Sequence, residues 1–360
     1  MNMKISEIRR KTINSLRYSF LGTSRLYFMC RYPLWNAERD QLIDFFKGKD
    51  LDPRQRKELL KQIKKAWFTQ HWSPKEFFIY NYENLTDEQR SEYVTEYERA
   101  RFCTEVNDYK KSEIFQNKWE TYQHFKKYFK RDAILVNGEK DVENPNVVKF
   151  LEKHTRIIMK PFTTACGRGI VMLNAIDSQD LRSQFLQLMK GNNTTYIMEE
   201  VILQAKEIAD FHPHSVNTIR LVTVRVKDGV RIFHPLMRFG YNNSVVDNAG
   251  GGGILCAIDL STGRLKTPGI NRKCEEFEKH PNSGKTFVGF AIPKWQELLS
   301  LAKEVAQVIP EVNYVGWDFA LTDNGWVMVE GNDIAQLIGY QQATHRGIKP
   351  EFLEIQSQMK

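Results

Sequence analysis

The sequence predicts an α+β protein with a mainly helical N-terminal region and two strand-rich units after it. Residues 1–132 place apolar side chains at helical spacing, and residues 133–203 mix short apolar strands with helices. Residues 204–360 are dominated by strands that end in glycine-containing turns. A chain of 360 residues with 41% hydrophobic content can hold one large or two to three small packed units and can bury a sizeable core. We therefore expect a mainly helical N-terminal region at 1–132 and two subdomains at 133–203 and 204–360.

The cysteines and the apolar runs indicate a protein of the reducing cytoplasm. No two cysteines have CxxC spacing, so the sequence indicates neither a disulfide framework nor a zinc site. No apolar run reaches the roughly 18–20 residues that span a bilayer, and no signal-peptide core is recognised. The five cysteines are scattered: Cys30, Cys103, Cys166, Cys256 and Cys274.

The net charge of +8 is unevenly distributed. Residues 1–31 contain seven lysines and arginines against a single acid, Glu7, together with several aromatic and aliphatic side chains. This composition fits a basic amphipathic segment on anionic lipid at the inner face of a membrane, or a solvated helix face, which the pattern favours. Nucleic acid is not indicated as a partner, because no nucleic-acid-binding motif accompanies the charge.

Capping signals mark the expected helices of the N-terminal region. Asp52 and Pro53 begin a helix that runs to Trp67, and Thr86 is expected to cap a helix that runs through residues 90–101. Asn117 caps a further helix with Lys118 in its first turn. A cation there opposes the helix dipole unless it points at an anion, so Lys118 is a candidate phosphate ligand.

The second unit combines a lysine with a glycine-containing loop. The strand at 156–161 carries Lys160 near its end, and the loop 163–169 that follows contains Gly167 and Gly169. Such a loop closes over phosphates through its backbone N–H groups, or it is a simple hairpin turn. It matches no Walker pattern. The strand at 196–203 then interrupts its apolar pattern with two acids, which suits a purine-binding connector or a solvated strand edge.

The third unit begins with a hairpin and a glycine run. Strands at 215–226 and 230–233 turn at 227–229, and they are followed by 235–240. Four consecutive glycines, 250–253, carry a large ordering cost. That cost is explained where the backbone must approach a ligand closely, although a plain flexible loop fits as well.

Residues 314–332 predict two apolar strands joined at Asp323-Asn324-Gly325. We expect Met328 and Glu330 to share one face of the return strand. This hairpin also carries Asp318 and Asn332, and burying such groups is costly unless a cation or a hydrogen-bond network compensates. Three converging oxygen ligands suit Mg²⁺. The alternative is a hairpin whose polar residues lie at solvated strand ends.

In this order, these elements resemble the ATP-grasp superfamily, and most closely its branch associated with sugar transfer and polysaccharide synthesis. The narrower likeness rests on three phrases: Ser215-Val216-Asn217-Thr218-Ile219-Arg220, Asp247-Asn248 before the glycine run, and His280-Pro281-x-x-Gly284. The resemblance covers roughly residues 105–345 and implies an ATP-grasp fold. A small lid at 133–203 and a C-terminal antiparallel sheet unit at 204–360 would clasp ATP.

The resemblance also implies a role for each matching residue. Asp318, Glu330 and Asn332 would hold Mg²⁺, while Arg220 and Arg238 would steady the phosphoryl group. The phosphoryl group or the acceptor would lie against Asn248 and the glycines at 251–253. The residues implied to bind ATP are Lys118, Lys160, Gly167, Gly169, Glu199, Glu200, Val201 and Glu207.

Two departures from the family pattern stand out. The loop 163–169 has fewer glycines than the loop of many relatives. Gly316 lies where several ligases of the superfamily carry an arginine, so Arg220 or Arg238 would supply that charge.

The resulting hypothesis is an ATP-dependent carboxylate–amine ligase that works through an acyl phosphate on a sugar or glycan precursor. Its small-molecule substrates would be a carboxylate and an amine, such as an amino acid. A kinase of a hydroxyl substrate on the same scaffold is the alternative, because its ATP half would look identical. A third hypothesis is a nucleotide-binding interaction module, docked by its basic N-terminal face to a membrane or a glycosyltransferase. The complete metal set argues against this module.

Overall fold

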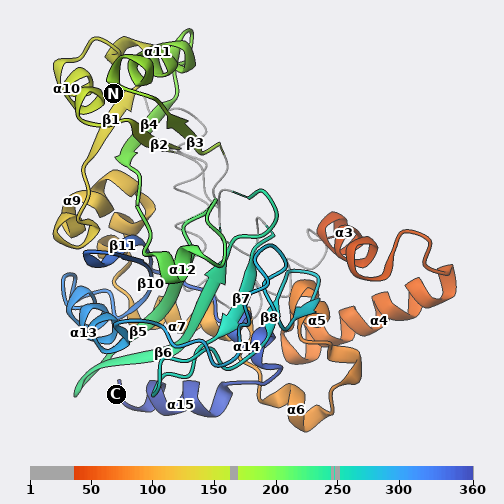
Figure 1. Cartoon of the computed structure of the whole chain (residues 1–360). Coiled ribbons are helices and arrows are strands. Elements are labelled where there is room, and N and C mark those ends of the chain that lie inside the picture. Colours follow the sequence, from red (N-terminus) through yellow and green to blue (C-terminus); the bar gives the residue numbers. More distant parts are fainter. Residues whose placement is uncertain (1–35, 163–168, 245–246, 248–251, 360) are drawn as a thin grey trace.

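In the computed structural model, two antiparallel sheets are surrounded by helices (Figure 1). The structure describes residues 36–162, 169–244, 247 and 252–359. Among them, no helix is both long and apolar enough for a bilayer crossing.

The N-terminal region is helical, as predicted, and its helices begin at side-chain caps. Asp52 accepts hydrogen bonds from Arg54 and Gln55 N–H and begins the helix predicted there. Thr86 caps only a short helix, because Thr95 caps a new one four residues after the first ends. The single helix expected through residues 90–101 is therefore wrong. The helices are α3 (Asn36–Lys47), α4 (Pro53–Gln70), α5 (Pro74–Ile79), α6 (Asp87–Ser91), α7 (Glu96–Val106) and α8 (Tyr109–Ser112), with 3₁₀ turns η2 (Tyr82–Asn84) and η3 (Glu113–Gln116).

Helix α9 (Lys118–Phe129) leads into the smaller sheet, which has the strand order β1-β4-β2-β3. Asn117 caps α9 as predicted, accepting from Trp119 and Glu120 N–H. Two amphipathic helices, α10 and α11, pack against each other and cover one side of the sheet. The elements are β1 (Ala133–Asn137), η4 (Glu139–Asp141), α10 (Pro145–Lys153), β2 (Arg156–Pro161), β3 (Val171–Asn174), α11 (Ser178–Met189) and β4 (Thr195–Glu200).

The larger sheet has seven strands in the order β11-β10-β5-β6-β7-β8-β9. One face packs on α9 and α13 through the main core, and the other packs on α7, α14 and α15. The elements are α12 (Lys206–Ala209), β5 (Thr218–Val226), β6 (Gly229–Phe239), β7 (Ile254–Ala257), β8 (Gly269–Ile270), β9 (Glu276–Phe277), α13 (Trp295–Val305), β10 (Tyr314–Thr322), β11 (Gly325–Asn332), α14 (Ile338–Thr344) and α15 (Lys349–Ser357).

The hairpin of β10 and β11 forms as predicted, but it contains a β-bulge. Phe319 pairs with Met328, whereas the preceding Asp318 pairs with Glu330, so Val329 is the extra residue. Residues that pair directly across antiparallel strands point to the same face. Met328 therefore joins Phe319 in the main core, and Glu330 points to the opposite face with Asp318. The prediction that Met328 and Glu330 share a face is wrong, because strict alternation ends at the bulge.

A second register shift occurs on the neighbouring pair of strands. Arg220 pairs with Leu236, but Val222 pairs with Phe233, so two residues of β6 stand opposite one of β5. One of them, His234, has a φ of 44°. This irregularity keeps Leu236 and Arg238 on the same face as Arg220.

Candidate functional site

Acidic and basic side chains form a row across the large sheet. Glu330, Asp318 and Arg220 are consecutive register partners on β11, β10 and β5, and they share one face. Arg238 on β6 pairs with Thr218, two residues from Arg220. The strand register alone therefore brings together two of the predicted metal ligands and both predicted arginines.

Asp318 is held by two guanidinium groups. Arg220 Nε donates to Oδ1, Arg220 Nη2 donates to Oδ2 at 2.9 Å, and Arg238 Nη2 lies 2.6 Å from Oδ2. Asp318 is only 2% exposed. Its burial acts to raise the pKa of the carboxyl, but the two arginines outweigh that effect and lower the pKa. Asp318 is therefore a buried carboxylate that stays ionised.

Glu330 lies in a different environment. The residue is exposed, yet desolvation of its carboxylate by the surrounding protein and the charge of Asp318 both raise its pKa. The charges of Arg220, Lys160 and Arg238 oppose that rise. Among the described residues, Glu330 makes no side-chain hydrogen bond or salt bridge. Its carboxylate is available to a ligand.

The predicted metal ligands offer oxygens of the type that Mg²⁺ prefers. Asn332 pairs with Gly316 next to the Asp318–Glu330 pair, and its Oδ1 accepts from Ile334 N–H at 3.1 Å. Two neighbouring carboxylates, one without a partner and with a raised pKa, fit a divalent cation that would neutralise them. No group of three or more His, Cys, Asp or Glu side chains suitable for a metal occurs among the described residues.

Lys160 and Glu199, both predicted to bind ATP, contact each other within the small sheet. Lys160 Nζ donates to Glu199 Oε2 at 2.9 Å, and Arg131 Nε donates to the same oxygen at 2.8 Å. Glu199 is buried, which acts to raise its pKa, but Lys160 and Arg131 lower the pKa to about 2. The Glu199 side chain is thus occupied by cations rather than open to a base edge.

Arg131 also connects the two sheets. Its Nη1 donates to the carbonyl of Met328 on β11 at 2.6 Å, while its other nitrogens contact Glu199 on β4. The residue is 8% exposed. Lys118, at the start of α9, donates to the carbonyl of Pro161 on β2 at 3.1 Å. These contacts place both predicted phosphate lysines at the junction between the sheets, where Lys160 lies close enough to Glu330 to affect its pKa.

The other predicted nucleotide residues lie at the end of β4, in the segment after it, and in the loop between β2 and β3. Glu200 ends β4, where Asp132 N–H donates to its carboxylate at 3.4 Å, and Val201 follows, half-buried. Glu207 is exposed on the short helix α12. Gly169 has a φ of 71°, and a Cβ there would lie 3.1 Å from Pro161. Gly167 lies outside the described residues.

The glycine run lies only partly within the described residues. Asn248, Gly250 and Gly251 are outside them. A Cβ on Gly253 would come 2.1 Å from the carbonyl oxygen of Asp247, so a side chain is excluded there by the protein's own backbone. At Gly253 the close neighbour is the chain's own backbone, and an approach of the glycine run to a ligand stays a prediction.

Sequence reasoning assigned no role to two residues beside Arg238. Thr218 Oγ1 accepts from Arg238 Nη2 at 2.7 Å, and Thr218 N–H donates to Asp247 Oδ2 at 2.9 Å. Burial raises the pKa of Asp247, although Arg238 and Thr218 oppose that rise. This network fixes the Arg238 guanidinium beside Asp318. The Thr-x-Arg spacing within the sequence phrase around Arg220 was the available signal.

Gly316 is explained by packing. A Cβ at this position would lie 2.2 Å from Ala335 Cβ and 3.3 Å from Arg220 Cδ. An arginine therefore does not fit there. Arg220 and Arg238 both place positive charge beside Asp318. This is the charge that the family resemblance assigns to one of them in place of an arginine at position 316.

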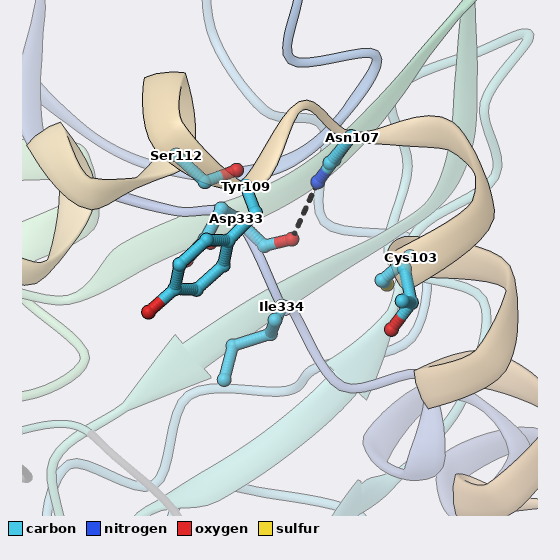
Figure 2. Close-up of a pocket in the computed structure, with 7 residues that line it drawn as sticks. Cys103, Asn107, Tyr109, Ser112, Asp333 and Ile334 are labelled. Atoms are coloured by element: carbon cyan, nitrogen blue, oxygen red, sulfur yellow. Dashed lines mark hydrogen bonds between the residues drawn. The ribbon is translucent and has the colours of Figure 1, made fainter. Parts of the chain in front are cut away.

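A small cavity lies behind the end of β11, between that strand and the N-terminal helices (Figure 2). It has room for about one water molecule. Asn107 Nδ2 donates to the Asp333 carbonyl at 3.0 Å, and Gln116 Nε2 donates to Asp333 Oδ1 at 3.0 Å. Burial raises the pKa of Asp333 to about 6. The cavity is too small for a substrate, and its polar contacts hold the end of the hairpin. Its lining residues are Cys103, Thr104, Asn107, Tyr109, Ser112, Asp333 and Ile334.

The chain is similar to several solved ATP-grasp structures at low identity. The ATP-grasp ligase PsnB, in complex with a phosphomimetic variant of its minimal precursor, Mg and ADP, has a TM-score of 0.42 and 12% identity, over 74% of this chain and 67% of that chain. D-Alanine-D-alanine ligase from Helicobacter pylori has a TM-score of 0.41 and 14% identity, over 69% and 61%. The ADP complex of purK, N5-carboxyaminoimidazole ribonucleotide synthetase, has a TM-score of 0.38 and 14% identity, over 66% and 52%. This chain thus spans about half to two thirds of the length of these proteins.

A comparison with curated proteins gives no match. The family profile described as sugar-transfer associated ATP-grasp matches residues 97–357, which is well over half of the chain. The chain therefore belongs to the sugar-transfer associated ATP-grasp family and has the ATP-grasp fold.

Proposed function

We propose that this protein is an ATP-dependent ligase that joins a carboxylate to an amine through an acyl phosphate. The observation that carries the proposal is the row Glu330–Asp318–Arg220 with Arg238 beside it, placed opposite Lys160 of the small sheet. Phosphoryl transfer needs charge neutralisation and positioning more than a covalent nucleophile, and this row supplies both signs of charge on rigid strands.

ATP would lie between the two sheets. Lys118 and Lys160, both at the junction of the sheets, would hold its phosphates, and the backbone of 199–201 with Glu207 would contact adenine and ribose. Asp318, Glu330 and Asn332 would hold Mg²⁺, which when bound neutralises the phosphate oxygens. The neighbours PsnB and purK were solved with ADP, and PsnB with Mg as well.

The two arginines would act on the transferred group. A substrate carboxylate oxygen attacks the γ-phosphorus of ATP, the bond to the bridging oxygen breaks, and ADP leaves. An amine then attacks the acyl carbon, inorganic phosphate leaves, and the nitrogen loses a proton to form an amide. Arg220 and Arg238 would steady the transferred phosphoryl group, with Asn248 and the glycines at 251–253 against it or the acceptor.

The family description suggests the substrate class. A family named for its association with sugar transfer supports a sugar or glycan precursor of surface polysaccharide as one substrate, with an amino acid among the candidates for the other. We further propose a cytoplasmic location, based on the scattered cysteines and the absence of CxxC spacing. The basic N-terminal segment is proposed to contact a membrane or a glycosyltransferase.

The test is coupled product release. Purified protein with Mg²⁺ and ATP is incubated with panels of carboxylates and amines, and ADP and phosphate are measured. The proposal expects release of both products only when a carboxylate and an amine are present together. A phosphorylated product that forms without any amine would instead identify a kinase. Bound nucleotide without turnover across a broad panel would favour an interaction module.

A further inference from the structure

The basic charge of this protein is concentrated before residue 71. Residues 1–70 contain 16 lysines and arginines against 7 aspartates and glutamates, whereas residues 71–360 contain 36 against 37. Within the described part of this region, α4 carries six basic residues and a single acid, Glu58. The matched family region, residues 97–357, contains 33 basic against 31 acidic residues and is close to neutral, and α4 lies before it.

The basic residues of α4 lie on one face of the helix. At about 100° per residue, five of them fall within an arc of about 100°, roughly opposite the buried face of Leu59, Ile63, Ala66 and Trp67. All five are exposed. The sixth, Arg56, turns toward α3, where its guanidinium contacts Asp40 at 3.1 Å and Asp44 at 2.8 Å. We call the five the α4 cationic face: Arg54, Lys57, Lys61, Lys64 and Lys65.

Within the described part of the chain, the charge of the α4 cationic face is almost uncompensated by acidic side chains. Lys61 lies 3.8 Å from Glu58, and the other four form no salt bridge with any described residue. The face extends over about 17 Å of straight helix. Helix α4 (orange in Figure 1) lies at the margin of the molecule, well away from the small sheet. A partner bound there would leave the junction between the two sheets open.

We propose that the α4 cationic face binds a membrane surface that contains anionic phospholipids. Four of the five residues are lysines, which are hydrated point charges rather than the planar forks that recognise a specific carboxylate or phosphate. A straight row on one side of a helix suits a flat, diffuse array of anionic headgroups. No nucleic-acid-binding motif accompanies the row. The proposal is independent of the ligase chemistry.

Vesicle binding tests the proposal. The full chain is mixed with phosphatidylcholine vesicles, either pure or with about one third phosphatidylglycerol, and the bound fraction is measured by sedimentation at low and high salt. Each basic residue near an anionic surface is worth about 1 kcal/mol, or about fivefold in affinity. The quadruple variant Lys57→Gln, Lys61→Gln, Lys64→Gln, Lys65→Gln should therefore lose on the order of several hundred-fold at low salt, and all binding should weaken as salt rises.

A matched control variant distinguishes the effect of the α4 cationic face from the effect of net charge. Lys149→Gln, Lys227→Gln, Lys279→Gln and Lys303→Gln remove the same charge from exposed positions scattered over the rest of the molecule. This control should bind anionic vesicles almost as well as the unmodified protein. Thermal unfolding shows whether each variant remains folded. Because all eight residues are exposed, both variants should remain folded.

Three results would overturn the proposal. The first is equal losses in the two quadruple variants, which would mean that only net charge matters. The second is vesicle binding that the α4 variant leaves unchanged, which would locate the contact elsewhere, for example in residues 1–35. The third is tighter binding to duplex DNA than to phosphatidylglycerol vesicles at the same salt concentration, which would make nucleic acid the anionic partner.

Discussion

Asp318 and Glu330 pair across β10 and β11, but they lie in different environments, and we expect them to have different roles. Asp318 is enclosed and bound to two arginines, so its charge is part of the structure as well as of the site. Glu330 is exposed, has no described partner and has a raised pKa, so its carboxylate is open to a ligand. The sequence motif alone assigns both residues the same role.

The two carboxylates should therefore respond differently to neutralisation. Glu330→Gln should abolish ADP release while leaving the unfolding temperature unchanged or slightly higher, because a repulsion with Asp318 is removed. Asp318→Asn should abolish release and also destabilise the protein by about 3–5 kcal/mol, because two guanidinium groups lose their partner. Thermal unfolding and an ADP assay on both variants check this. Equal stability of the two variants would contradict the description of Asp318.

Lys160 should contribute to nucleotide affinity. Lys160→Ala removes one charge-assisted contact, so the binding free energy for Mg²⁺·ATP should weaken by about 1.5–3 kcal/mol. Lys153→Ala, an exposed lysine at the end of α10, is the control and should change nothing. Calorimetric titration with a non-hydrolysable ATP analogue measures both variants. An unchanged affinity for the Lys160 variant would remove this lysine from the site.

The salt bridges of Glu199 predict a pH-dependent stability. Its pKa is lowered from 4.5 to about 2 in the folded protein, so its stabilising effect is complete above about pH 4.5 and disappears as the pH falls toward 2. Glu199→Gln should lower the free energy of unfolding by about 3–5 kcal/mol at pH 7, and the difference from the unmodified protein should shrink toward pH 2–3. Urea unfolding at several pH values checks this. A difference that stays constant with pH would contradict it.

At the scale of residues, the sequence is enough to identify charged residues that differ in chemistry from their sequence neighbours. Asp318 and Glu330 stand out because they interrupt apolar strands, and Lys160 because it precedes a glycine loop. Arg131 could not be identified, because an arginine in a basic stretch looks solvated. Its role depends on contacts with Glu199 and Met328, which only folding brings together.

At the scale of elements, the bulge at Val329 decides where Glu330 points. Regular alternation from Met328 would turn Glu330 toward the apolar core, and the extra residue turns it toward Asp318 instead. Strand identity, turn position and hairpin pairing could all be predicted from apolar periodicity and the Asp-Asn-Gly turn. The bulge could not, because no residue in Gly325–Asn332 is a specific bulge signal.

If Val329 is the bulged residue, the protein should tolerate its deletion. Removing Val329 should leave Glu330 opposite Asp318 and Met328 opposite Phe319, so the protein should fold and keep measurable activity. Removing Val327 instead should turn Met328 out of the core and destabilise the protein by about 2–5 kcal/mol. Expression, thermal unfolding and the ADP assay compare the two deletions. A Val329 deletion that is as damaging as the Val327 deletion would contradict the bulge assignment.

At the scale of the whole molecule, the candidate site lies at the junction of two sheets, and the N-terminal helices contact the segment just after the β10–β11 hairpin. Arg131 connects β4 to β11, Lys118 connects α9 to β2, and Asn107 and Gln116 hold Asp333 just after the hairpin. The fold class could be predicted from periodicity. The supporting role of the N-terminal helices could not, because the contacts of Asn107 and Gln116 with Asp333 join residues more than 200 positions apart.

The most direct test of the central claim is a crystal structure with Mn²⁺ in place of Mg²⁺ and a non-hydrolysable ATP analogue. We expect anomalous density for the metal at the oxygens of Asp318, Glu330 and Asn332, at about 2.0–2.2 Å. We also expect the triphosphate between that metal and the two lysines, Lys118 and Lys160. Metal density away from this hairpin, or a nucleotide that contacts neither lysine, would contradict the account.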